Sequence, residues 1–194
     1  MDALLASIAR KKALLDTLRP ASSAALQHLQ KSYDVELTYT SNAIEGNTLT
    51  LRETAEVIEH GITVGGKRLK DHLEAVDHYE AVLWMRQLAS DPSPVGEAVI
   101  RDLHRRIVAR SEPGIAGIYS PHRRRNDGSP VVFPNPLLIR FGYVPVAVRP
   151  EDRSVYLDAP EHASLADDLE PFQTFIHRRL DDTLTDYVDA LAGC

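Results

Sequence analysis

Residues 40–53 read Thr-Ser-Asn-Ala-Ile-Glu-Gly-Asn-Thr-Leu-Thr-Leu-Arg-Glu. Apolar side chains at helical spacing precede this stretch and predict a helix over about residues 24–42. Gly46 suits the end of that helix, because glycine readily adopts the left-handed conformation common just after a helix. Thr50 and Glu53 then form a capping box, the pair that satisfies backbone N–H groups at a helix start. The stretch therefore predicts a break between two helices.

The rest of the chain predicts further helices and one hairpin. Asp71 and Glu74 form a variant of the capping box and are expected to start the next helix. An Asp-Gly pair, a strong turn signal, predicts a β-hairpin within residues 117–134. The expected fold is all-α with this one short hairpin, in two regions at residues 1–92 and 93–194. The other helices are expected at about residues 4–18, 50–61, 71–89, 96–110, 150–163 and 171–191.

The composition argues against several classes of protein. A net charge of −6 over 194 residues does not suit a general binder of nucleic acid or anionic membranes, because both need a basic surface. The sequence contains no run of 18 apolar residues, so no membrane span is predicted. Cys194 is the one cysteine, so no disulfide forms within one chain, as is usual in a reducing compartment. We expect a cytoplasmic protein.

Three local patterns resemble binding or metal sites, but each fits an ordinary structural role better. Residues 61–68 nearly match a phosphate-binding loop, but Arg68 replaces the magnesium-binding hydroxyl and a helix precedes the loop. The basic run at residues 122–125 is more typical of a solvated strand than of a nucleic-acid site. His72 and His78 lie six residues apart, on different helix faces, so no metal site is expected.

Glu45 is the acid whose position raises a question. A carboxylate at the C-terminal end of a helix faces the negative end of the helix dipole, which is mildly unfavourable. The simpler interpretation is a surface acid before a glycine cap. The functional interpretation is an acid held there to meet a cation or an arginine.

The stretch from Ser41 to Glu53 resembles the inhibitory motif of Fic proteins whose inhibitory helix precedes the catalytic core. The resemblance covers roughly residues 30–190 and implies the helical Fic fold, with its flap hairpin at about residues 117–134. Other blocks that resemble the family are residues 66–75, 103–107, 117–119, 128–129, 142–145, 151–157 and 168–176.

The resemblance implies transfer of AMP from ATP, with magnesium, to a hydroxyl group of a target protein. It assigns Glu45 as the inhibitory residue, which in relatives pairs with an arginine of the catalytic signature, and it places Ser41, Gly46 and Asn47 in the same motif. It also implies nucleotide-site positions at Arg125, Asn126, Asp127, Gly128 and Tyr156, and a dimer contact at Leu69.

The family's catalytic signature, His-x-Phe-x-[Asp/Glu]-Gly-Asn-Gly-Arg-x2-Arg, occurs nowhere in the sequence. By resemblance, the gap lies between Pro136 and Leu137, and several dozen residues that carry the general base, the magnesium-binding acid and the phosphate cradle are absent. We therefore expect no catalysis, no catalytic or metal-binding residue, and weak or absent ATP binding.

Two other interpretations stay open. The chain is a non-catalytic helical module that pairs with itself or with a full-length relative through residues 50–75, or it is a deletion product of an active Fic enzyme.

The missing segment is expected to contain two core helices, and their loss would expose apolar surface to solvent. The sequence therefore predicts a loosened C-terminal half, self-association, or a partner helix in the gap.

Overall fold

The computed structural model describes residues 1–19, 23–91, 94–118, 135–156, 158 and 168–193, and every regular element within them is helical. The elements are α1 (Asp2–Leu18), α2 (Ser23–Ile44), α3 (Leu51–His60), α4 (Leu69–Ala89), α5 (Glu97–Ile107), the 3-10 turn η2 (Pro113–Ile115), α6 (Asn135–Arg140), the 3-10 turn η3 (Pro150–Asp152) and α8 (Glu170–Ala192).

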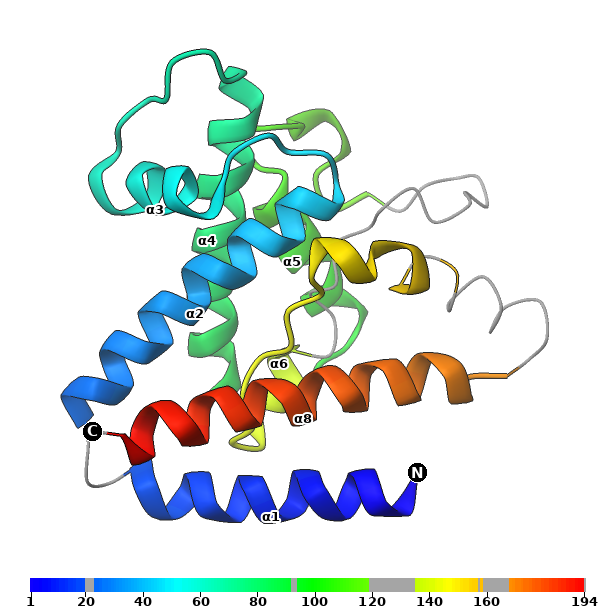
Figure 1. Ribbon diagram of the computed structural model, residues 1–194. Coiled ribbons are helices and arrows are strands. Elements are labelled where there is room, and N and C mark those ends of the chain that lie inside the picture. The colour runs from blue at the N-terminus through cyan, green and yellow to red at the C-terminus, as the bar shows by residue number, and fades with distance from the viewer. Residues whose placement is uncertain (20–22, 92–93, 119–134, 157, 159–167, 194) are drawn as a thin grey trace.

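The helices form a bundle around α2 and α4. α1 and α8 lie side by side along one edge, and α2 crosses above them toward α3 (Figure 1). α4 packs against α2, α3, α5 and α6. An extended segment, residues 143–149, runs between the helices and buries Val144, Val146 and Val148. No described helix is long and apolar enough to span a membrane.

The largest apolar cluster joins the two ends of the chain. Ile8 and Leu15 of α1 pack with Leu184 and Leu191 of α8 and with Val146 of the extended segment. Burying side chains of this size contributes about 1.5–3 kcal/mol each. This cluster therefore fixes α8 and residues 143–149, the part of the chain that lies beyond the expected gap.

A buried ion pair ties α2 to α4. Arg86 donates to both carboxylate oxygens of Asp34, with Nε–Oδ2 at 2.8 Å and Nη2–Oδ1 at 2.6 Å. Tyr187 of α8 stacks at a tilt on Tyr33 of α2, with ring centroids 4.2 Å apart. These contacts set how α2 lies against α4 and α8.

The predicted helix boundaries are largely confirmed. Thr50 and Glu53 form the predicted capping box, and Gly61 closes α3 in the left-handed conformation. Residues 61–68 form an irregular loop, as the simpler interpretation holds. The predicted hairpin lies almost wholly outside the described residues.

Two predicted helix starts differ from the structure. α4 begins at Leu69, with Arg68 as the residue before it and no side-chain cap, so the capping box predicted at Asp71 is wrong. The Asp71 carboxylate instead accepts hydrogen bonds from Thr48 of the α2–α3 connection. The segment after residue 150 is a 3-10 turn that continues as helix through residue 156, and most of its predicted remainder lies outside the described residues.

Asn135 stitches the chain at the expected gap. It is fully buried at the start of α6. Its Nδ2 donates to the Val146 carbonyl oxygen (3.0 Å), and its Oδ1 accepts the Val146 N–H (2.7 Å). One side chain thus satisfies both backbone groups of a buried residue, which would otherwise cost free energy.

We expect Asn135→Ala to lower the free energy of unfolding by about 2–5 kcal/mol, because it leaves two buried backbone groups without a partner. Urea unfolding measures the change. Leu137→Ala, on the exposed side of the same helix, is the control and is expected to cost less than about 1 kcal/mol. Equal effects of the two variants would contradict a role for this amide pair.

His78 makes stability depend on pH. It is buried between α4 and α2, where its Nδ1 lies 3.1 Å from the Thr38 hydroxyl, and burial lowers its pKa from the ordinary 6.5 to about 4. The folded state therefore holds a neutral imidazole that the unfolded chain protonates below pH 6.5. Stability is fully present above pH 6.5 and is lost as the pH falls toward 4, by up to about 3 kcal/mol.

In His78→Gln we expect the free energy of unfolding to fall less steeply between pH 6.5 and pH 4 than in the wild type. Urea unfolding at several pH values measures the slope. His60→Gln, at an exposed histidine, is the control and should keep the wild-type slope. A His78→Gln slope equal to that of the wild type would refute this account.

Candidate functional site

The predicted inhibitory motif lies at the C-terminal end of α2. Ser41 and Ile44 are buried, whereas Glu45 is exposed just beyond the last helical residue. The N–H groups of Glu45 and Asn47 both donate to the Asn42 carbonyl oxygen, at 3.1 and 3.0 Å. Gly46 has a φ of 89°, which favours glycine, and there the chain leaves the helix. The structure therefore keeps Ser41, Glu45, Gly46 and Asn47 together as one helix end.

Asn47 fastens this helix end to α4. Its Nδ2 donates to the Asp71 carbonyl oxygen (2.9 Å) and to Glu74 Oε2 (2.8 Å), while its Oδ1 accepts the Leu49 N–H (3.0 Å). An asparagine that uses both ends of its amide has little freedom to reorient. The side chain of Asn47 thus holds the position of the motif.

Asp71 makes the second link between the motif and α4. Its carboxylate is fully buried, accepts from the Thr48 hydroxyl and pairs with Arg68 at 2.6 Å. Burial raises the pKa of Asp71, but the bonds from Thr48 and Arg68 outweigh burial and hold that pKa below its ordinary value. Asp71 is therefore ionised at neutral pH and is committed to this link.

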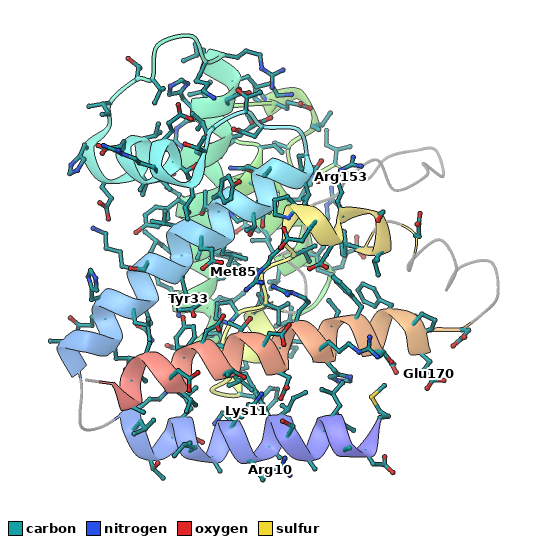
Figure 2. The ribbon with its side chains drawn as sticks, in the orientation of Figure 1. Arg10, Lys11, Tyr33, Met85, Arg153 and Glu170 are labelled. Atoms are coloured by element: carbon teal, nitrogen blue, oxygen red, sulfur yellow. The ribbon has the colours of Figure 1, made fainter. Side chains whose placement is uncertain are left out.

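The other side of the helix end faces the C-terminal half. Ile44 packs against Val148 and Phe175, and Arg153 Nε donates to the Ile44 carbonyl oxygen at 2.7 Å. Figure 2 labels Arg153 beside the end of α2. Burial, and next the negative charge of Glu45, raise the pKa of Tyr156 to about 12. The structure thus brings Tyr156 to the same helix end as Glu45.

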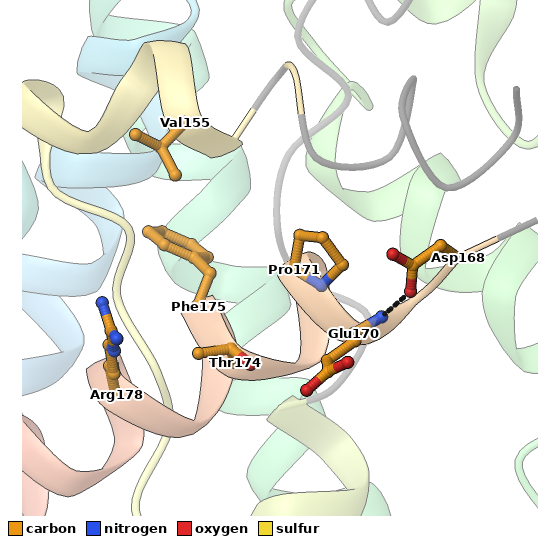
Figure 3. A pocket seen from close by; sticks show the side chains of 7 residues that line it. All are labelled: Val155, Asp168, Glu170, Pro171, Thr174, Phe175 and Arg178. Atoms are coloured by element: carbon orange, nitrogen blue, oxygen red, sulfur yellow. Dashed lines mark hydrogen bonds between the residues drawn. The ribbon is translucent and has the colours of Figure 1, made fainter. Parts of the chain in front are cut away.

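A shallow hollow of about 360 Å³ lies at the start of α8. Its floor is apolar, with Phe175, Val155 and Pro171, and its rim is charged (Figure 3). Asp168 Oδ1 accepts the Glu170 N–H at 2.9 Å, so this carboxylate already caps α8. The hollow lies close to Tyr156, whose ring centroid is 6.3 Å from that of Phe175.

The signature that implies a magnesium–ATP site in the family does not occur in this sequence. Among the described residues, no three histidine, cysteine or acidic side chains converge. The family's base, metal-binding acid and phosphate cradle have no counterpart in the sequence. α6, which resembles the end of the signature helix, is only six residues long. The flap positions Arg125, Asn126, Asp127 and Gly128 lie outside the described residues.

Leu69 is the predicted dimer contact. It is the first residue of α4 and is 69% exposed. Its neighbours in the chain pair with acids, Arg68 with Asp71 and Lys70 with Glu112. The structure therefore presents an apolar side chain to solvent between two paired cations.

Sequence reasoning missed the residues that hold the motif. Arg153 reaches Ile44 from 109 residues away, and Asp71 was assigned to a helix cap. The spacing of Thr48 and Asp71 in the sequence carries no local signal. The sequence did hold the Arg68-x2-Asp71 pair, whose i,i+3 spacing is typical of an ion pair on a helix start.

The chain is similar in sequence and in fold to known Fic proteins. No family model matches the sequence. A protein of Nematostella vectensis named protein adenylyltransferase Fic is 24% identical over 223 residues, covering 87% of this chain and 52% of that protein. A protein of the same name from Drosophila willistoni is 30% identical over 109 residues, covering 56% of this chain and 22% of that protein. The chain thus spans about half or less of these relatives' length.

The longer match also contains a gap. It extends over 223 residues but includes only 87% of a 194-residue chain. The Nematostella protein therefore has several dozen residues in the matched region that have no counterpart here.

Solved structures show the same fold. Fic-1 of Caenorhabditis elegans superposes with a TM-score of 0.78 at 21% identity, covering 95% of this chain and 71% of that one. A Fic domain containing signaling protein from Bacteroides thetaiotaomicron superposes with a TM-score of 0.80 at 22% identity, covering 96% and 97%. The chain therefore has the fold of these Fic proteins and is similar in sequence to proteins named protein adenylyltransferase Fic.

Proposed function

We infer that this chain is a Fic-family protein that does not itself transfer AMP and that retains the family's inhibitory helix end as a structural element. The observation that carries this proposal is the absence of the signature from the sequence. AMP transfer is the activity that the names of the relatives state. The proposal concerns how far that activity extends to this chain.

Catalysis of the family's kind needs three things that act together. A general base must accept the proton of the target hydroxyl, an acid must hold magnesium, and backbone N–H groups at a helix N-terminus must cradle the phosphates. The signature that supplies all three in the family does not occur in this sequence. The several dozen positions of the Nematostella protein without a counterpart here support the same proposal.

The absence of the signature changes the role of Glu45. The resemblance implies that Glu45 would pair with an arginine of the signature, and the signature does not occur in this sequence. The helix end is nevertheless fully built, with Asn47 and Thr48 bonded to α4 and Ile44 bonded to Arg153. We propose that this helix end now stabilises the fold and joins its two halves.

Incubation with labelled ATP and magnesium tests the loss of catalysis. We expect no label above background on the chain or on added proteins, with the wild type and with Glu45→Gly alike. Because the Glu45→Gly change would release an inhibited enzyme, this variant is the more sensitive test for residual activity. Glu151→Gly, at another exposed acid, is the matched control, and a relative that keeps the signature is the positive control. Robust labelling with either wild type or Glu45→Gly would overturn the proposal.

A second candidate function is an interaction module that pairs through residues 50–75. Leu69, Leu51 and Ile62 are all large apolar residues that this region exposes. Exposed apolar side chains that gather on one region are typical of protein contacts. The partner would be a second copy or a full-length relative.

Light scattering tests the second candidate. We expect a mass that rises from monomer to dimer with concentration, and we expect Leu69→Asp to remove the dimer, since a buried charge at a contact is costly. Leu83→Asp, at another exposed leucine of α4, is the control and should keep it. A mass that stays monomeric at all concentrations would exclude pairing between copies.

A further inference from the structure

One long-range hydrogen bond joins the predicted inhibitory helix end to the C-terminal half. Arg153 Nε donates to the Ile44 carbonyl oxygen at 2.7 Å, across 109 residues of sequence. The last carbonyl groups of a helix have no partner within the helix, and the C-terminal end of a helix favours a cation. A guanidinium at this place therefore satisfies an orphan acceptor and meets the negative end of the dipole.

The side chain of Ile44 is held by the same stretch as its carbonyl. Ile44 is 2% exposed and packs with Val148 and Phe175, with Tyr156 partly buried against them. Val148 and Arg153 lie five residues apart on the segment that follows the hydrogen bonds between Asn135 and Val146. One segment thus fixes both the backbone and the side chain of the last residue of α2.

Glu45 and Gly46 consequently lie between two anchored residues, Ile44 and Asn47. On one side, Arg153 holds Ile44; on the other, Asn47 is bonded to the first turns of α4. The Glu45 side chain is exposed. The two anchors hold the backbone on either side of it.

The anchor at Arg153 is the weaker of the two. Its side chain is exposed, and among the described residues it pairs with no carboxylate, so that its one polar contact is the Ile44 carbonyl. Asn47 makes three hydrogen bonds on its side. A single exposed contact opens more readily than such a set, because local opening follows the number of bonds and the burial of a segment.

We propose that Arg153 is a latch: it positions the backbone of the segment that carries Glu45, and its release loosens that segment while α4 and α8 stay folded. The inference rests on the proposed function only in taking Glu45 as the residue of an inhibitory motif. It is tested without ATP, so its outcome is separate from that of the labelling experiment.

Hydrogen exchange of backbone amides tests the latch. In Arg153→Met we expect the amides of Glu45, Gly46 and Asn47 to exchange about 3–10-fold faster than in the wild type, which is the range for loss of one hydrogen bond. Amides in the middle of α4 and α8 should keep their wild-type rates. Arg153→Lys should restore part of the protection, because an ammonium also suits a helix C-terminus. Arg52→Met, at an exposed arginine of α3, is the control and should change nothing at residues 45–47.

A second measurement distinguishes a role of Arg153 in positioning Glu45 from a general role in stabilising the fold. In the wild type, Glu45→Gln should lower the pKa of the Tyr156 phenol, followed by NMR of the tyrosine ring. In the Arg153→Met background the same change should have a smaller effect, because Arg153 no longer holds the backbone next to Glu45. The latch is disproved by unchanged exchange at residues 45–47, by equal acceleration along the whole chain, or by an undiminished effect of Glu45→Gln.

Discussion

The C-terminal end of α2 is held from two sides, by the start of α4 and by the segment that contains Val148 and Arg153. Toward the N-terminal region, Asn47 and Thr48 bond to the start of α4, where the buried carboxylate of Asp71 accepts the Thr48 hydroxyl. Toward the C-terminal half, Ile44 packs on Val148 and Phe175 and accepts the bond from Arg153. A helix end leaves carbonyl groups that must find partners, and here long-range contacts supply them.

This constraint explains how a Fic fold survives the expected loss of its signature region. The C-terminal half shares a core with α1, because α1 packs along α8 and Val144 and Val146 are buried in the same cluster. Asn135 closes the joint by satisfying both backbone groups of Val146. The extended segment then carries the chain from this joint to the helix end at Ile44. The signature does not occur in the sequence, whereas the helices on both sides of this joint are still connected.

Local sequence patterns predicted most of the helices and the centre of the motif. The capping box at Thr50 and Glu53 and the glycine signals at Gly46 and Gly61 act over a few residues, and the structure contains all of them. Asp71 shows where local reasoning fails. Its spacing to Glu74 imitates a helix start, but the helix begins earlier and the carboxylate bonds a distant threonine instead.

The contacts that hold the site could not be predicted from the sequence, because they join distant residues. No periodicity links Arg153 to Ile44 or Asn135 to Val146, and each of these residues has an ordinary local role in a turn or a short helix. The resemblance to the family assigned a role to Glu45 and pointed to the missing signature, whereas physical reasoning on Glu45 alone left its role open. Chemistry was thus predicted from resemblance, and the means of holding it came from the structure.

The most direct test of the central claim, a Fic fold without a nucleotide site, is calorimetric titration of the purified chain with ATP and magnesium. The account predicts no measurable binding, meaning a Kd weaker than about 1 mM, or about −4 kcal/mol, for the wild type and for Glu45→Gly. Saturable binding in the micromolar range that requires magnesium would contradict it.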